Sequence, residues 1–136
     1  LGDVYKRQVR NVKKVYPISK EINQAIIETY EYLQTLPNEK ARQKHLKRVE
    51  KGLKEQYTAR MKKLSFTQGK LLIKLIDRQS NSTSYELVKA FMGPFKAGFY
   101  QTFAALFGAS LKKEYDPLGE DKLTERVVLL VENGQI

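Results

Sequence analysis

The chain has 136 residues, which is enough for one domain whose folding buries about two thirds of the surface of the unfolded chain. It contains no cysteine, and this excludes disulfides, zinc–thiolate sites and thiol nucleophiles while fitting either a reducing cytoplasm or an exported protein. Its net charge of +10 favours anionic partners, and its apolar runs are far shorter than the about 20 residues of a membrane span.

Charge is distributed unevenly along the chain. Between Glu39 and Lys63, ten Lys or Arg residues accompany three Glu residues, which gives a local charge of +7. From Glu114 to the end, six acidic residues accompany Lys122 and Arg126, which gives a local charge of −4. A basic segment of this size attracts polyanions over about a Debye length. Alternatively, the acidic end lies beside the basic segment and neutralises it within the fold.

The first eight residues, LGDVYKRQ, are interpreted as foreign to the protein. Asp3 to Gln8 resemble the translated end of a transposon-based sequencing adapter, and Leu1 and Gly2 would come from the adjoining adapter bases. On this interpretation the natural chain enters at Val9 and its own start is missing, so residues 1–8 are left out of fold reasoning. The alternative is a native N-terminal tail of the same composition.

Residues 9–36 are predicted to form the first helix, because apolar residues recur there at spacings of three and four. Pro17 lies inside this pattern. Proline removes a backbone donor and clashes with the preceding turn, so we expect a kink or a break at this position. Pro37 ends the element, and Asn38 is expected to cap the next helix by accepting from its first amide groups.

The second helix is predicted over residues 39–64 and has the clearest amphipathic pattern in the chain. At about 100° per residue its apolar side chains fall in one stripe. These are Leu46, Val49, Leu53, Tyr57, Met61 and Leu64. Its lysines gather on a separate face, about 80 to 160° around the helix from Leu46. These are Lys40, Lys44, Lys47, Lys51, Lys54 and Lys62.

The middle of the chain is predicted to contain a short buried helix between two polar breaks. Ser65–Gly69 is interpreted as a break with capping residues. Leu71–Ile76 is apolar on almost every side, and since no second strand signal could pair with it, we predict a central helix. Residues 77–82 are predicted to be a polar loop.

Two helices are predicted to follow this loop. Thr83 and Glu86 have the spacing of a capping box, in which each side chain satisfies the other's backbone donor. That helix is predicted to stop at Gly93, and Pro94 suits the first turn of its successor.

The successor, residues 94–107, has a ridge of phenylalanines on one side. Phenylalanine recurs every four residues at Phe91, Phe95, Phe99, Phe103 and Phe107. Such a ridge could line a hydrophobic ligand pocket, but beside Ala and Gly it is far more often core. Ala97, Gly98, Ala104 and Ala105 are expected to leave room for another helix.

The last helix is predicted to start at Asp116-Pro117 and to stop at Asn133-Gly134. Its buried face is expected to comprise Leu123, Val127, Leu130 and Val131.

The lysine face of the second helix is the candidate anion-binding site, with Lys44, Lys47, Lys51 and Lys54 as its residues. It could bind the phosphates of anionic lipid, an acidic polymer or nucleic acid. Nucleic acid is disfavoured, because base reading favours Arg and no aromatic residues are interleaved with the lysines. The alternative is a charged face that contacts only water.

Asp77, Arg78 and Tyr85 form a polar cluster of undetermined role. Asp77 near the end of an apolar helix opposes the helix dipole and therefore needs a partner, such as Arg60, Arg78 or the amides near Thr83. A buried structural ion pair is favoured over a catalytic acid acting with Glu86 or Tyr85.

No catalytic residue, metal site or cofactor site is predicted. His45 is the only histidine, and it lies among cations that oppose its protonation, with no orienting acid nearby in the sequence. The sequence contains no nucleophile elbow, phosphate loop or dinucleotide fingerprint.

Several segments together resemble a known family. They are Val9–Pro17, Leu46–Glu50, Gln68–Arg78, Thr83–Lys89, Glu114–Pro117, Gly119–Asp121 and Glu132–Gln135. In order and content they are similar to the Bacteroidetes family called domain of unknown function 4294, over essentially all of residues 9–136. The chain departs from that pattern at Gly52 and in residues 79–82. Members typically begin with a secretion signal, so the resemblance implies export to the periplasm or cell envelope.

We therefore predict a compact all-α bundle of five or six helices, formed by residues 9–136 as a single domain. The leading functional hypothesis is a non-enzymatic envelope protein that binds a partner protein or an anionic surface. The alternatives are a hydrolase-type enzyme acting on an envelope polymer, and nucleic-acid binding through the basic second helix.

Overall fold

The first quarter of the chain is one long helix. The computed structural model describes residues 2–83, 86–111 and 114–136, and α1 spans Gly2–Thr35. The helix is not broken at Pro17. Val12 and Val15 before the proline and Ile22 after it are all buried in the same core, so packing on both sides holds the helix together across the missing backbone donor.

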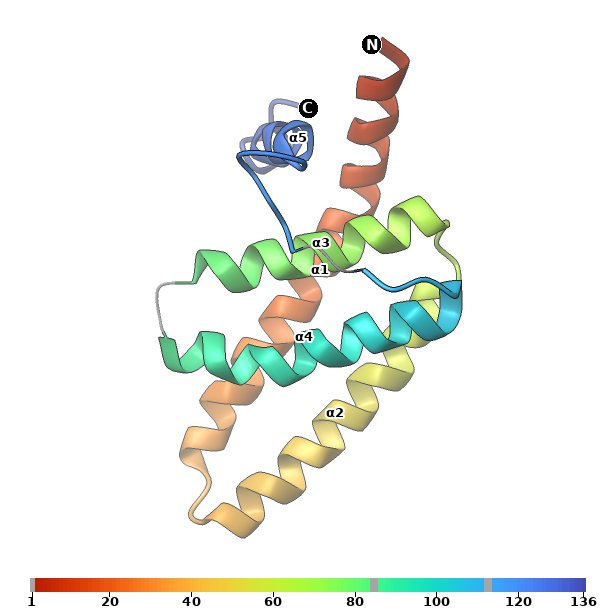
Figure 1. Ribbon diagram of the computed structural model, residues 1–136. Helices are drawn as coiled ribbons and strands as arrows, with labels where there is room; N and C mark the ends of the chain where they lie inside the picture. The colour runs from red at the N-terminus through yellow and green to blue at the C-terminus, as the bar shows by residue number, and fades with distance from the viewer. Residues whose placement is uncertain (1, 84–85, 112–113) are drawn as a thin grey trace.

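The second helix returns alongside the first (Figure 1). α2 spans Glu39–Met61, and the Asn38 side chain accepts from the Ala41 amide at 2.9 Å, which confirms the predicted cap. The apolar stripe also faces the core as predicted. Its second half is buried, while Leu46 and Val49 are partly buried and pack against the core.

α3 forms the centre of the molecule and is longer than predicted. It spans Phe66–Ser82, and Ser65 and Gln68 form a capping box at its start. All residues from Leu71 to Asp77 are buried. The predicted break at residues 65–69 and the predicted loop at residues 77–82 are therefore wrong over most of their length. The polar residues of the second segment remain helical because they find partners on neighbouring elements.

α4 is one helix where two were predicted. It spans Glu86–Phe107 and passes through Gly93 and Pro94 without a break. Met92 and Phe95 are both buried, so one continuous surface packs on the core across this pair of residues. Thr83 is the C-terminal cap of α3, and residues 84–85, over which the predicted capping box extends, lie outside the described residues.

The phenylalanine ridge of α4 belongs to the core. Phe95, Phe99 and Phe103 are at most 6% exposed, while Phe91 and Phe107 are partly buried against the same cluster. α4 packs on α3 and α2.

A close approach between helices occurs at Gly69 of α3, where none was predicted. A Cβ atom at Gly69 would lie 2.8 Å from Cε2 of Phe107, so only glycine admits this ring without a shift. Of the alanines of α4 that were predicted to leave room for another helix, Ala97 and Ala105 are exposed and Ala104 is partly buried. At Gly98 a Cβ atom would meet no atom within 4 Å.

The chain ends in a short helix whose start and buried face were only partly predicted. α5 spans Lys122–Glu132, several residues after the expected start at Asp116-Pro117. Val127 and Val128 are fully buried, whereas Leu123 is 41% exposed. Gly134 ends the element as predicted, with a φ of +68° that favours glycine.

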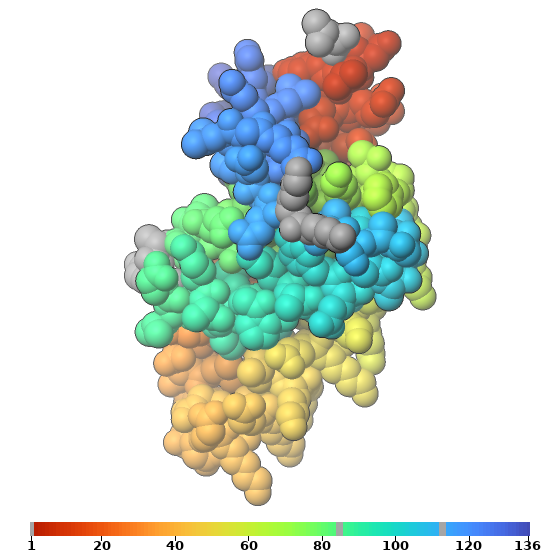
Figure 2. Space-filling view, viewed as in Figure 1, coloured from red at the N-terminus to blue at the C-terminus, as the bar shows by residue number. Residues whose placement is uncertain are grey.

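The helices are arranged so that the basic and acidic segments lie apart. α3 and α4 run side by side across the long axis of α1, α2 covers the lower part of α4, and α5 lies at the opposite end (Figures 1 and 2). α5 packs on α1. The expectation that the acidic end neutralises the basic helix is therefore wrong.

The fold class was predicted correctly. Residues 2–83, 86–111 and 114–136 contain five α-helices and no strand, in a compact bundle. None of the described helices combines the length and the apolar character that crossing a membrane would require.

Candidate functional site

Asp77 is the most buried charged residue of the polar cluster. It lies on α3 with 0% of its surface exposed. The Lys96 ammonium of α4 donates to its Oδ1 at 2.6 Å, and the Tyr115 amide donates to its Oδ2 at 2.7 Å. Its partners are therefore Lys96 and a backbone amide, and not Arg60, Arg78 or the amides near Thr83. Each carboxylate oxygen accepts from a different segment, so Asp77 links α3 to α4 and to the segment at Tyr115.

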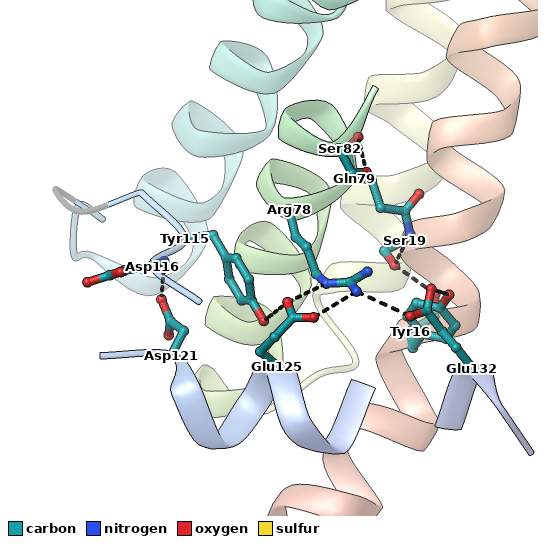
Figure 3. Close-up of polar contacts among 10 residues, drawn as sticks. All are labelled: Tyr16, Ser19, Arg78, Gln79, Ser82, Tyr115, Asp116, Asp121, Glu125 and Glu132. Atoms are coloured by element: carbon teal, nitrogen blue, oxygen red, sulfur yellow. Dashed lines mark hydrogen bonds and ion pairs between the residues drawn. The ribbon is translucent and has the colours of Figure 1, made fainter. Parts of the chain in front are cut away.

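Arg78, one residue further along α3, points toward α5 (Figure 3). Its guanidinium donates to both carboxylate oxygens of Glu125, from Nε at 2.8 Å and from a terminal nitrogen at 2.9 Å. The same terminal nitrogen donates to Glu132 at 3.2 Å. A bidentate pair of this kind fixes the orientation of α5 as well as its position.

Two tyrosines complete the contacts around these carboxylates (Figure 3). The Tyr115 hydroxyl donates to Glu125 at 3.0 Å, and the Tyr16 hydroxyl of α1 donates to Glu132 at 2.7 Å. The hydrogen bonds from Arg78 hold the pKa of Glu125 below its usual range, against the opposing effect of burial. Burial raises the pKa of Tyr16 to about 12, assisted by the adjacent Glu132. Glu125 thus remains charged and bound to Arg78 near neutral pH.

Lys74 extends the same face of α3 by one turn. Only 5% of its surface is exposed, and its ammonium donates to Asp121 at 2.9 Å. The same oxygen of Asp121 accepts from the Asp116 amide at 2.8 Å. Residues 74, 77 and 78 are spaced three and four apart, so they lie on one face of the helix. This face binds the segment from Tyr115 to Glu132.

Asp77 and Glu86, one of the two pairs proposed for acid–base chemistry, do not come together. Glu86 begins α4, ten residues before Lys96, and a rise of 1.5 Å per residue places it about 15 Å along the helix from the contact with Asp77. Glu86 is exposed, and its closest cation is Lys89 at 4.0 Å. Tyr85 lies outside the described residues. The arrangement of Asp77 does not support the proposed pairing with Glu86.

The lysine face is exposed along α2. Lys44, Lys47, Lys51 and Lys54 all face solvent, and none forms an ion pair within the parts of the chain that the structure describes. Two arginines of the same helix, in contrast, form ion pairs. Arg42 pairs with Glu39 at 3.2 Å. Arg60 pairs with Glu21 of α1.

His45 packs against an aromatic ring. Its imidazole lies 4.5 Å from the ring centre of Tyr32 on α1. Across the described ranges, no group of three or more His, Asp or Glu side chains is positioned to hold a metal ion.

A pocket lies between α2 and α4, and two phenylalanines of the ridge line it, which was the less favoured of the two interpretations of that ridge. The volume of the pocket is about 200 Å³, and Leu53 of α2 with Phe95 and Phe99 of α4 supply its large apolar side chains. The other lining residues are Glu50, Lys54, Thr58, Gly98, Gln101 and Thr102. Lys54 therefore belongs both to the lysine face and to this pocket.

A comparison with known families agrees with the fold and the motifs. The family described as Domain of unknown function (DUF4294) matches residues 3–130. The chain belongs to this family. The resemblance inferred from the sequence motifs is thereby confirmed. No curated protein and no solved structure matches the chain.

Within this DUF4294 domain, the sequence indicated Asp77 and Arg78 but none of their partners. Lys96, Glu125 and Glu132 are 19, 47 and 54 residues away from them in the chain. One signal was available: Lys74, Asp77 and Arg78 share a helix face, while the C-terminal segment has an excess of acidic residues.

Proposed function

We propose that this DUF4294 domain is a non-enzymatic binding domain of the bacterial cell envelope, which attaches to an anionic lipid surface through Lys44, Lys47, Lys51 and Lys54. One observation carries the proposal: these four lysines are exposed on one helix and have no ion-pair partner among the described residues. The placement in the envelope rests on the family resemblance.

The contrast between the two groups of charges supports this choice. The buried Lys74 and the partly buried Arg78 are held by Asp121 and Glu125 and serve to position α5. The lysines of α2 have no such structural task. Several positive charges close together repel one another and so destabilise the fold, and an anionic surface would reduce this repulsion.

The residue type favours a surface over a specific ligand. Lysine is a strongly hydrated point charge on a flexible stem, and it suits diffuse attraction more than the bidentate geometry that arginine gives. A lysine near an anionic membrane contributes about 1 kcal/mol, so four contribute about 4 kcal/mol. That is sufficient for reversible attachment to a surface.

The test is sedimentation of the protein with vesicles over a range of salt concentrations. We expect binding to mixed phosphatidylglycerol–phosphatidylcholine vesicles and none to pure phosphatidylcholine vesicles. Binding should disappear between about 0.1 M and 1 M salt, as the Debye length falls from about 10 Å to about 3 Å. Binding that is equal on both vesicle types, or unchanged by salt, would reject the proposal. Absence of binding at low salt would reject it also and would favour an acidic protein partner.

A further inference from the structure

We propose that the pocket between α2 and α4 binds a medium-chain alkyl carboxylate, with the chain against Leu53, Phe95 and Phe99 and the carboxylate at Lys54. This goes beyond attachment to a surface, because a free amphiphile in the pocket needs no membrane.

The shape and lining of the pocket favour a short alkyl chain. Its volume of about 200 Å³ lies below the about 300–1,000 Å³ of pockets for drug-sized ligands. Two aromatic rings and a leucine supply its large apolar side chains, and the Thr102 hydroxyl is already used, since it donates to the Gly98 carbonyl at 3.0 Å. A slender apolar chain fits such a space better than a polar ring does.

Gly98 keeps the pocket open. Glycine is among the least favourable residues in a helix interior, yet it lies here within α4. No steric demand explains it, because a Cβ atom at this position would meet no atom within 4 Å. Any larger side chain at residue 98 would project into open space and narrow the pocket.

The charges around the pocket select the head group. Lys54 and Glu50 are the charged lining residues, one helical turn apart. Lys54 has no ion pair in the described chain, and Lys51 and Lys47 lie about one and two turns before it on the same face of α2. The local potential is therefore positive, and a carboxylate at Lys54 complements it, whereas a quaternary ammonium is repelled.

Decanoate is the probe, and its binding is followed by isothermal titration calorimetry and by the amide shifts of the pocket residues in nuclear magnetic resonance spectra. The wild-type protein should bind decanoate and should not bind decyltrimethylammonium. Gly98→Leu, which fills the pocket, should abolish binding. The control is Gly52→Leu, at a second helical glycine whose Cβ position is equally open but lies outside the pocket. Unchanged decanoate binding in Gly98→Leu, or equal binding of both amphiphiles, would overturn the proposal.

A charge exchange provides a second test that leaves the core untouched. Lys54→Gln should weaken decanoate binding by about two- to fivefold, and Glu50→Gln should strengthen it by a similar factor, as expected for exposed charges. Shifts of both variants in the same direction would contradict the assigned head-group position.

Gly98→Leu should still bind anionic vesicles. If the wild-type protein binds decanoate but not anionic vesicles, only the proposed attachment to a surface is rejected. If it binds the vesicles but not decanoate, only the proposed pocket ligand is rejected.

Discussion

Replacing Lys44, Lys47, Lys51 and Lys54 with glutamine is expected to weaken binding to phosphatidylglycerol-containing vesicles by about a thousandfold. Each lysine near an anionic membrane contributes about 1 kcal/mol, and each 1.4 kcal/mol corresponds to a factor of ten in affinity. Loss of four contributions therefore lowers the affinity by about three orders of magnitude. Vesicle sedimentation at low salt measures this difference. Thermal stability should change little, because all four side chains are exposed.

The matched control removes the same charge elsewhere. Lys13, Lys14 and Lys20 of α1 and Lys122 of α5 are also exposed and form no ion pair in the described parts of the chain. Replacing these four with glutamine lowers the net charge by the same amount. We expect this variant to keep most of its affinity. An equal loss in both variants would mean that net charge, and not the α2 face, causes the attraction.

Replacing Asp77 with alanine is expected to lower the free energy of unfolding by about 3–5 kcal/mol, the range for breaking a buried charge pair. The change leaves the ammonium of Lys96 and the buried amide of Tyr115 without their acceptor. Small proteins are stable by only about 5–15 kcal/mol, so this is a large fraction of the total. Urea denaturation followed by circular dichroism measures it.

Two further variants separate a structural role of Asp77 from a chemical one. Asp77→Asn keeps the size and one acceptor, so it should lose less stability than Asp77→Ala. Lys89→Ala breaks an exposed pair with Glu86 and should change stability little. If Asp77→Ala is as stable as the wild-type protein, then the buried ion pair does not hold the fold together. The interpretation of Asp77 as a structural residue would then be wrong.

Local patterns predicted the helices better than their ends. The cap at Asn38 and the stop at Gly134 were correct, because each depends on a few neighbouring residues. The predicted end of α3 was wrong, because the polarity of Asp77 and Arg78 indicated a loop. In the fold they pair with Lys96 and Glu125 and remain helical. Tertiary packing therefore outweighed local propensity at both ends of α3.

α4, which is one helix where two were predicted, also shows that local patterns alone do not determine where a helix ends. Gly93 and Pro94 are ordinary signals for the end of one helix and the start of another. The burial of Met92 and Phe95 on one surface outweighs them here. This burial depends on how α4 packs against α2 and α3, which the pattern of residues 86–107 alone does not contain.

The candidate sites differ in how far the sequence predicts them. The exposure of the lysine face follows from the periodicity of one helix, so it could be derived without a fold. The pocket and the contacts of Arg78 each combine separate helices. They depend on how α2 meets α4 and on where α5 attaches, and no local pattern contains this information.

The orientation of the bound domain tests the central claim most directly. The chain has no cysteine, so Gln43→Cys and Gln24→Cys each introduce a single site for a polarity-sensitive fluorophore. Gln43 borders the lysine face on α2, and Gln24 lies on α1. Both are exposed, and each donates to a glutamate four residues away. On anionic vesicles the label at residue 43 should become shielded from iodide quenching, and the label at residue 24 should remain accessible. Shielding at residue 24 with an unchanged label at residue 43 would contradict attachment through α2.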